Sequence, residues 1–467
     1  MDKNLVEAVS KDPTKRNAAL EGTIRRRLEA IGIERAQLAT TLKERFPSFA
    51  ALSKPAPMSI NETKTLLLDD EALVILDFDA QSYAWVITRK SADWVKLTVN
   101  ATGLIEEVKS LRSALGFDIG KPFDTQLALK IYMQTFGVIA DKLQGKKRLS
   151  VITNGALTSL PLQILVTKDP TGKALKDIDW LARSYAITNL PSVASLKTLR
   201  STAPSSSAKK QMIAFADPIF SKEESTQVAS TGSSKARSVA PRSPLSVYDM
   251  GKPDLVSLAK FLPQLPDTAD EVRTIGEVLK ADKNDIKLGT SASVTTVKQA
   301  KLDDYHVVYF ATHGLIAGDV EKFAKLKAEP ALVLTLPNKP TDFDNGLLTA
   351  SEVAQLKLDA DWVVLSACNT AAEGSPGAEA LSGLARAFFY AGAKSLVVSH
   401  WAVDTVATVQ LMTGMFQAIA NNPGLSHAEA LQKSMLSMID SAKFDQQAHP
   451  SLWAPVVVVG EPARVAR

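Results

Sequence analysis

Apolar residues recur with two different periods along the chain. Near the amino terminus they return every three or four positions, at Ile24, Leu28 and Ile31, among charged residues, which predicts an amphipathic helix. Prolines then interrupt the pattern, so we expect residues 1–55 to form a helical segment. Beyond residue 60 the apolar residues instead gather in short runs of strand length, which alternate with helical patterns.

Nearly continuous apolar runs mark the strands that the sequence predicts. They are EALVILDF, YAWVITRK, LSVIT, QMIAFA, HVVYFA, ALVLTL, WVVLSA, SLVVSH and PVVVVG. Strands that are apolar throughout and alternate with helices are typical of a parallel sheet covered by helices on both faces. The sequence therefore predicts an α/β fold built on a mostly parallel sheet flanked by helices.

Changes in composition give the expected division of the chain after the helical segment. We assign residues 56–210 to a first half of the remaining chain and residues 211–467 to a second half. Residues 201–250 contain twelve serines together with prolines and scattered basic residues, and only QMIAFA there has the character of a strand. Because such a segment buries little apolar surface, residues 217–250 are predicted to be an exposed flexible loop.

Composition and charge narrow the class of protein. The chain has 467 residues, of which 45% are hydrophobic and 22% charged, as in a globular protein with a sizeable core. A net charge of +4 is too small for a dedicated nucleic-acid binder. No apolar run approaches the ~20 residues of a membrane span, and the amino terminus lacks the apolar stretch of a signal peptide. With a single cysteine, we expect a cytoplasmic protein without nucleic-acid or membrane partners.

Two predicted strands run into potentially reactive side chains. HVVYFA is followed by Thr312, His313 and Gly314, and WVVLSA by Cys368. Because the carboxyl ends of parallel strands meet at one edge of a sheet, we expect these side chains to be neighbours. A thiolate can attack a carbonyl carbon while an imidazole activates the thiol or protonates the leaving amine. The histidine precedes the cysteine by 55 residues, which matches the order in caspase-type proteases.

Each of these residues also has a structural interpretation that the sequence leaves open. A single cysteine on an apolar strand is often a small core residue. Asn369 either orients Cys368 or caps a helix, Trp401 either walls a substrate pocket or packs in the core, and Asp404 either lines that pocket or caps a helix. The chain contains no phosphate-binding loop, dinucleotide fingerprint or spacing of metal ligands, so no cofactor or metal is predicted.

Longer stretches surround both strand ends, namely HVVYFATHG, DNGLLTASEV, WVVLSACNT, ALSGLARAFFYAGAKSLVVSHWAVDTVAT and HPSLWAPVVVVG. Together they resemble the CHAT domain, a caspase-like and separase-related cysteine protease domain found mostly in bacteria, often behind tetratricopeptide repeats. The resemblance implies His313 as the base and acid of a dyad, Cys368 as its nucleophile, and the backbone N–H groups of Gly314 and Cys368 as the oxyanion hole. It also implies a degenerate, catalytically silent caspase-like first half, and residues 1–55 resemble the helical connector that follows the repeats in longer members of the family.

The chain departs from the family pattern beside the predicted substrate pocket. Ser399, His400 and Trp401 stand where the family often has Ser-Leu-Trp, and Asp404 is the single acid where two are frequent. The pocket is therefore assigned to Asn369, Ser399, Trp401 and Asp404. Its preference stays open between a basic and an apolar substrate residue, with an acidic one ranked last.

These observations predict a caspase-like cysteine endopeptidase that cleaves a partner protein and is held inactive until triggered. By family analogy, the substrate is a pore-forming or signalling protein encoded nearby, and a repeat-containing region or partner regulates the enzyme. The alternative is a catalytically silent caspase-like scaffold that only binds a partner. An acyltransferase or hydrolase with the same dyad would need a small-molecule pocket, which the sequence does not indicate.

Overall fold

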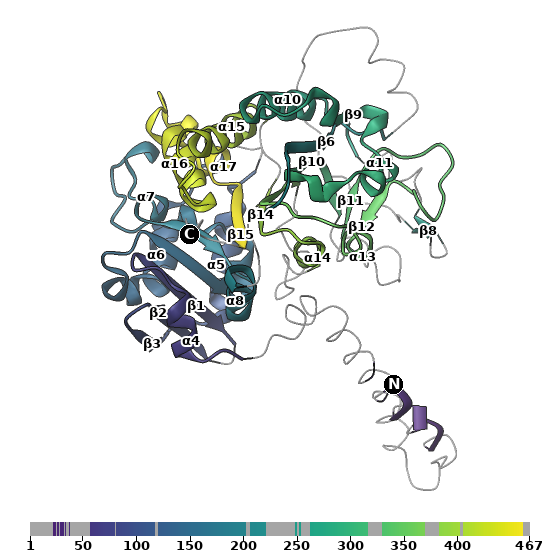
Figure 1. Cartoon of the computed structure of the whole chain (residues 1–467). Helices are drawn as coiled ribbons and strands as arrows, with labels where there is room; N and C mark the ends of the chain where they lie inside the picture. The colour runs from purple at the N-terminus through teal and green to yellow at the C-terminus, as the bar shows by residue number, and fades with distance from the viewer. Residues whose placement is uncertain are drawn as a thin grey trace. The chain divides into compact units, whose positions relative to one another are not determined.

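The computed structural model divides the chain into two compact units, Met1–Pro57 and Met58–Arg467. It describes scattered positions between residues 22 and 37, together with residues 57–79, 81–116, 120–201, 206–220, 248–249, 252–253, 262–315, 329–368, 383–401 and 405–460. The described positions between 22 and 37 are helical, as the amphipathic pattern predicts. Every described strand belongs to the second unit (Figure 1). None of the described helices is both long and apolar enough to span a membrane.

Strands from both halves of the second unit join in one sheet. In the first half they are β1 (Glu71–Phe78), β2 (Ser82–Thr88), β3 (Ala92–Lys96), β4 (Arg148–Thr153) and β5 (Ala186–Asn189). In the second half they are β6 (Lys210–Ala216), β9 (Ile286–Leu288), β10 (Tyr305–Leu315), β11 (Ala331–Val333), β12 (Leu347–Thr349), β13 (Trp362–Cys368), β14 (Ser395–Ser399) and β15 (Val456–Gly460). A separate ribbon pairs β7 (Tyr248–Asp249) with β8 (Lys252–Pro253).

Most neighbouring strands of the sheet run parallel. Its main path is β12-β11-β10-β13-β14-β15-β5-β4-β1-β2-β3, and β6 and β9 continue beside β10. β1, β4 and β5 are parallel in the first half, and β9, β6, β10, β13 and β14 are parallel in the second. β15 is antiparallel to β14 and parallel to β5, so it joins the two halves. The predicted α/β fold with a mostly parallel sheet is therefore confirmed.

Helices cover both faces of the sheet. The α-helices of the second unit are α4 (Ile60–Leu66), α5 (Ala101–Arg112), α6 (Thr125–Gln134), α7 (Leu181–Ser184), α8 (Val193–Ser201), α10 (Asp267–Leu279), α11 (Val294–Gln299), α13 (Ala350–Val353), α14 (Leu384–Ala391), α15 (Thr405–Asn421), α16 (His427–Asp440) and α17 (Pro450–Trp453). Short 3-10 helices include η2 (Gly137–Leu143) and η3 (Gly155–Ser159). In the second half, α10, α15 and α16 lie over one face and α14 over the other (Figure 1).

The two halves share a hydrophobic core at their junction. The rings of Trp180 from the first half and Trp453 from the second lie 5.3 Å apart in one cluster of buried residues. Beside this cluster, the guanidinium of Arg112 donates to the carbonyl oxygen of Ser159 and, at 3.3 Å, to that of His400. Because those carbonyls belong to different halves, Arg112 connects the segment after β4 to the residue after β14.

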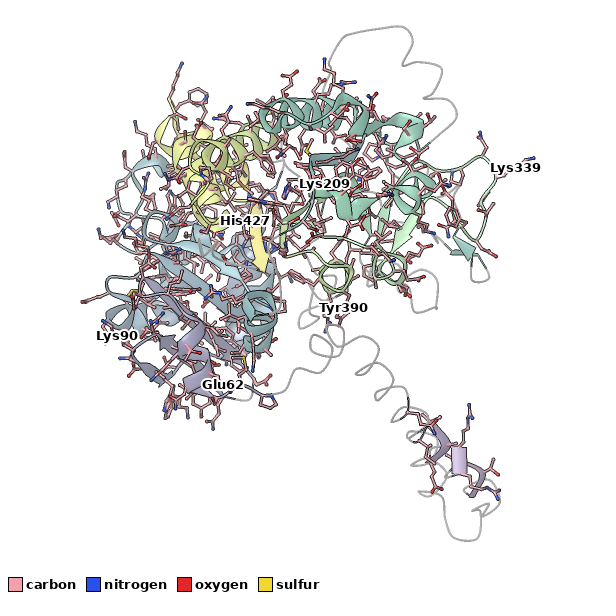
Figure 2. The ribbon with its side chains drawn as sticks, in the orientation of Figure 1. Glu62, Lys90, Lys209, Lys339, Tyr390 and His427 are labelled. Carbon is pink, nitrogen blue, oxygen red and sulfur yellow. The ribbon has the colours of Figure 1, made fainter. Side chains whose placement is uncertain are left out.

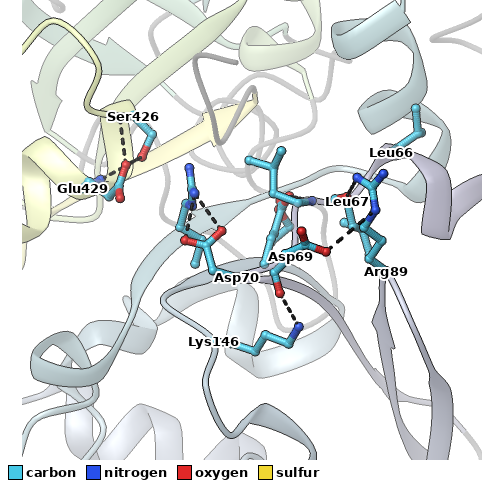
Figure 3. A network of polar contacts seen from close by, with 12 residues as sticks. Leu66, Leu67, Asp69, Asp70, Arg89, Lys146, Ser426 and Glu429 are labelled. Atoms are coloured by element: carbon cyan, nitrogen blue, oxygen red, sulfur yellow. Dashed lines mark hydrogen bonds and ion pairs between the residues drawn. The ribbon is translucent and has the colours of Figure 1, made fainter. Parts of the chain in front are cut away.

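Side chains form hydrogen bonds with nearby backbone groups at the ends of several helices and strands (Figure 3). Ser426 and Glu429 form a capping box at the start of α16, where the Glu429 carboxylate accepts from the Ser426 N–H at 2.9 Å and from its hydroxyl at 2.6 Å. Ahead of β1, the Lys146 ammonium donates to the carbonyl oxygen of Asp69 at 2.7 Å. The first contact fixes where α16 begins, and the second ties the turn before β1 to the segment before β4.

The segment predicted as a flexible loop, residues 217–250, lies largely outside the described residues. Its first residues differ from the prediction, because Phe220 is only 3% exposed and packs in a small apolar cluster with Ala331, Val333 and Leu347. Burying this aromatic side chain offsets the entropy lost when the residues after β6 become ordered. The expected exposure is therefore wrong for Phe220, while the flexibility of the segment stays a prediction.

Candidate functional site

The parallel ladder between β10 and β13 brings the predicted dyad together. The Cα atoms of the two strands pair from Val307 with Trp362 up to His313 with Cys368. Register partners on neighbouring strands lie on the same face of a sheet. The backbone therefore places the histidine and the cysteine side by side at the carboxyl ends of adjacent strands, as the order of apolar strands and reactive residues predicts.

The strand that carries His313 is longer than the sequence predicts. We expected the apolar run to end at Ala311 and a loop to carry His313 and Gly314. Instead β10 continues to Leu315, because β11 pairs with its last residues in antiparallel fashion, with Gly314 opposite Leu332. Pairing with β11 satisfies backbone groups that would otherwise lack partners beyond the end of β6. The candidate base is thus held by a sheet rather than by a loop.

Two contacts fix the imidazole of His313, which is 8% exposed. Its Nε2 lies 2.8 Å from the carbonyl oxygen of Pro263, and its ring centroid lies 5.3 Å from that of Phe220. A carbonyl oxygen only accepts hydrogen bonds, so Nε2 carries the proton and the neutral ring keeps its lone pair on Nδ1. This tautomer leaves Nδ1 able to take a proton.

The environment of His313 keeps the ring neutral near pH 7. Burial lowers the pKa of His313 below the usual value, and the hydrogen bond to Pro263 raises it in part. A neutral imidazole is the form that can act as a general base. The electrostatics of the buried ring are therefore compatible with proton abstraction at neutral pH.

Sequence reasoning missed Pro263 and Phe220 as neighbours of the histidine. Pro263 acts through its backbone carbonyl, and every residue type has one, so no residue type signals this role. Phe220 falls inside the serine-rich segment after Pro218 and Ile219, where the sequence gave no strand or helix pattern. Only the path of the chain around the end of β10 shows that these two residues contact His313.

The structure places the predicted pocket residues unevenly. Ser399 ends β14, and because Val398 pairs with Leu365, Ser399 stands beside Ser366, one strand along from the dyad. Asn369 and Asp404 lie outside the described residues, as does the side chain of Cys368. The roles assigned to those groups therefore remain predictions.

Trp401 packs in the core near the junction of the halves. It is 5% exposed, belongs to the main hydrophobic cluster, and donates from Nε1 to the carbonyl oxygen of Ser451 at 3.1 Å. A buried indole whose N–H is satisfied by backbone is held by packing. This position favours the structural interpretation of Trp401 over a wall of the substrate pocket.

His400, the departure from the family pattern, is a structural residue. It is 1% exposed, and burial first, with the Arg112 guanidinium second, lowers the pKa of His400 to about 3. Its Nδ1 has no partner among the described residues, while the ring bonds to the backbone of Ser159. The neutral ring therefore connects the residue after β14 to the segment after β4.

The remaining histidines stabilise other parts of the fold. His427, at the start of α16 (Figure 2), stacks on Trp362 with ring centroids 3.4 Å apart. His306 bonds to Asp361 at 2.8 Å, and His449 caps α17. No three His, Cys, Asp or Glu side chains among the described residues lie together as metal ligands would.

The first half has no comparable chemistry where its strands end, because residues 56–210 contain neither histidine nor cysteine. Asn154 follows β4 instead. Its amide oxygen accepts from the N–H of Phe78 at 2.8 Å, and its amide nitrogen donates to Asp77. These bonds join the end of β4 to the end of β1.

A family model of the CHAT domain matches residues 125–461. The chain belongs to the CHAT domain family. The match begins at α6 in the first half and runs through β15, so it contains both strands that carry the dyad. The resemblance deduced from the residues around His313 and Cys368 is thereby confirmed.

The chain is also similar to part of two much longer animal proteins. Over 119 residues it is 32% identical to mouse tetratricopeptide repeat protein 28 and 31% identical to its human counterpart. Each alignment covers 26% of this chain, and the chain spans only 5% of the length of those relatives. The family is found mostly in bacteria, whereas these two relatives are animal proteins. The cytoplasmic location expected above remains a prediction.

Solved structures of proteases match this chain at low sequence identity and with TM-scores below 0.5. A separase–securin complex from Saccharomyces cerevisiae matches with a TM-score of 0.43 and 11% identity, over 86% of this chain and 30% of that one. The Arg-specific cysteine proteinase gingipain R matches with a TM-score of 0.38 and 10% identity, over 85% of this chain and 78% of that one. The assignment to the family rests on the CHAT match.

Proposed function

We propose that this CHAT domain protein is a cysteine endopeptidase with His313 and Cys368 as its catalytic dyad. The observation that carries the proposal is the register of β10 and β13, which pairs these two residues at the strand ends. The neutral ring of His313, with Nε2 bonded to Pro263, supports the assignment because it leaves Nδ1 as the basic atom.

In the proposed first step, Nδ1 of His313 takes the proton of the Cys368 thiol. The thiolate then attacks the carbonyl carbon of the scissile peptide bond. Backbone N–H groups of Gly314 and Cys368 stabilise the negative charge that forms on the carbonyl oxygen. As the C–N bond breaks, His313 returns the proton to the leaving amine, and the acyl group remains on the sulfur as a thioester.

In the second step, water replaces the amine. Nδ1 removes a proton from the water molecule, the resulting hydroxide attacks the thioester carbonyl, and the C–S bond breaks. The carboxylic acid product leaves, and the proton on His313 returns to the thiolate. During both steps the Pro263 carbonyl accepts from Nε2–H, which keeps the ring in place and stabilises its charged form.

Burial of His313 favours one alternative, a silent scaffold that only binds a partner. An 8% exposed ring packed on Phe220 is also what a structural histidine looks like. In either case a protein partner is proposed, namely a pore-forming or signalling protein with a repeat-containing regulator. As a substrate, we propose a chain cleaved after a basic or an apolar residue.

Cleavage of a peptide library by the full chain tests the enzyme against the scaffold. We expect turnover by the wild type and none by Cys368→Ala, because the chain has no other thiol. A peptide with a thiol-directed warhead should label the wild type at Cys368. Turnover that persists in Cys368→Ala would rule out the dyad. Absence of both turnover and labelling would leave the scaffold as the function.

A further inference from the structure

A buried carboxyl group lies behind the two strands of the dyad. Glu271, on α10, is 2% exposed. Its carboxylate accepts hydrogen bonds from the hydroxyl of Tyr309 on β10 and from that of Ser366 on β13. One side chain of the covering helix is thus bonded to both strands that end at the candidate site.

The positions of these two hydroxyls relate them directly to the dyad. Tyr309 precedes His313 by four residues and Ser366 precedes Cys368 by two. Because successive residues of a strand alternate between faces, Tyr309 shares a face with His313, and Ser366 shares that face with Cys368. Glu271 therefore joins β10 to β13 on the same face of the sheet that carries the dyad.

The segment leading into α10 contacts the dyad as well. Pro263, just ahead of the helix, accepts the hydrogen bond from His313 at 2.8 Å. Residues 263–271 therefore touch the imidazole at one end and both strands at the other. A helix that is fixed to the strands by Glu271 also fixes the carbonyl that orients the histidine.

Burying the carboxylate of Glu271 destabilises the fold more than burying that of Glu71, because only Glu71 pairs with a cation among the residues that the structure describes. Glu71, which is fully buried in the first half, pairs with the guanidinium of Arg200 at 2.9 Å. Among the described residues, Glu271 bonds to two hydroxyls and no cation. Burial raises the pKa of Glu271 to about 7, although both hydrogen bonds lower it. An apolar side chain would avoid this desolvation cost, which indicates a role beyond stability.

We propose that Glu271 is a positioning residue for the dyad. By bonding to Tyr309 and Ser366 it holds β10 and β13 in the alignment that keeps His313 against Cys368. This inference rests on the proposed function, since a silent scaffold would have no need for the alignment. It predicts that removing the hydrogen-bond acceptor at position 271 uncouples the thiol from the imidazole while the fold remains.

The test measures how fast iodoacetamide alkylates Cys368 as a function of pH, in the full-length chain. The chain has one cysteine, so the adduct reports on the nucleophile alone and no substrate is needed. His313 is neutral before the reaction and becomes the charged partner of the thiolate when it takes the thiol proton, so in the wild type we expect an apparent thiol pKa below the ~8.5 of a free cysteine. Glu271→Leu should move the profile toward ~8.5 and slow alkylation at pH 7 by roughly tenfold. On a cleaved peptide, kcat should fall and KM should stay nearly constant.

Conservative and partial variants separate positioning from bulk stability. Glu271→Gln should keep a profile close to the wild type, because its amide oxygen still accepts from both hydroxyls. Ser366→Ala removes only the link to β13 and should shift the profile in the same direction as Glu271→Leu. If Glu271→Leu fails to fold, Ser366→Ala decides. The matched control is Glu71→Gln, which perturbs a buried glutamate of the first half and should leave the alkylation profile unchanged.

Specific outcomes would overturn the inference. It is wrong if Glu271→Leu, or Ser366→Ala in its place, alkylates as the wild type does. It is also wrong if Glu71→Gln shifts the profile equally, because the effect would then reflect lost stability. The His313→Ala variant distinguishes failure of the positioning role from failure of the dyad. A shift in His313→Ala without one in the Glu271 variants overturns the positioning role alone, whereas no shift in His313→Ala overturns the proposed function itself.

Discussion

The parallel strands of the two halves end in different chemistry. In the first half, Asn154 follows β4, and its amide bonds to the N–H of Phe78 and to Asp77. In the second half, β10 and β13 end with His313 in register with Cys368. In the first half the residues at the strand ends bond to one another, whereas in the second half a histidine is in register with a cysteine. The sheet determines which residues become neighbours, and the residue types determine whether catalysis can follow.

The two halves also differ in whether their buried glutamate pairs with a cation. The charge of Glu71 is compensated by Arg200, with a further hydrogen bond from the Ser150 hydroxyl at 2.7 Å. Glu271 has two hydroxyl partners behind the dyad. A buried carboxylate that pairs with a cation is typical of a structural role. A buried carboxylate without a cationic partner is more often found at a functional site. The difference fits the proposed function, in which the first half is structural and the second half carries the catalytic dyad.

Replacing the dyad should have the largest effect. Cys368→Ala should abolish peptide cleavage, and His313→Ala should lower kcat by roughly 10²–10⁴-fold because the general base is lost. Since His313 is buried and packs on Phe220, its alanine variant should also lose about 1–3 kcal/mol of stability. Steady-state kinetics and urea unfolding measure the two effects. An unchanged kcat in His313→Ala would mean that neither half supplies a catalytic base where its strands end, and the proposed difference between the halves would be wrong.

The pH dependence of stability should show the buried His400. Its pKa is about 3 in the folded chain, against about 6.5 in the unfolded chain. The unfolded state therefore binds the proton first, so stability is intact above pH 6.5 and falls as the pH drops toward 3. The slope from this one group is at most about 1.4 kcal/mol per pH unit.

Urea unfolding of the wild type and of His400→Gln across that pH range isolates this contribution. The glutamine amide can donate to Ser159 as the ring does, but it does not titrate. We expect the difference between the two curves to change steadily below pH 6.5. Parallel curves would show that His400 is protonated in the folded protein and that the junction of the halves is more open than its burial indicates.

Replacing Arg112, whose guanidinium bonds to both halves, should have the next largest effect on stability. Arg112→Met removes the donors to Ser159 and His400 and should cost about 2–3 kcal/mol, as charge-assisted hydrogen bonds do. Arg89, whose side chain is 53% exposed and pairs with an 80% exposed Asp69, is the control and should lose less than about 1 kcal/mol on replacement by alanine. Equal losses in thermal unfolding would show that Arg112 contributes no more than a surface charge.

Replacing Asn154 should have the smallest effect. Asn154→Ala removes two hydrogen bonds between the ends of β4 and β1 and should cost about 1–2 kcal/mol. The rate of peptide cleavage should not change, because this residue belongs to the half without a dyad. A loss of kcat with unchanged stability would instead give the first half a direct part in catalysis.

Sequence patterns predicted most of the strands and the neighbouring positions of His313 and Cys368 because both follow from local rules, whereas β3 and β12 were missed. Apolar runs such as WVVLSA specify buried parallel strands, and parallel strands align their carboxyl ends. The extension of β10 depends on β11, which lies beyond a long intervening segment, so no local signal indicated it. The Pro263 carbonyl and the Glu271 carboxylate were missed for a similar reason. Their roles depend on how α10 packs on the sheet.

The most direct test of the dyad compares Cys368 alkylation in the native chain with that in the urea-unfolded chain at pH 6.5. An activated thiol should react faster in the native state than in the unfolded state, and His313→Ala should remove that advantage. A native thiol that reacts more slowly than the unfolded one, with or without His313, would identify Cys368 as an inert core residue and contradict the account.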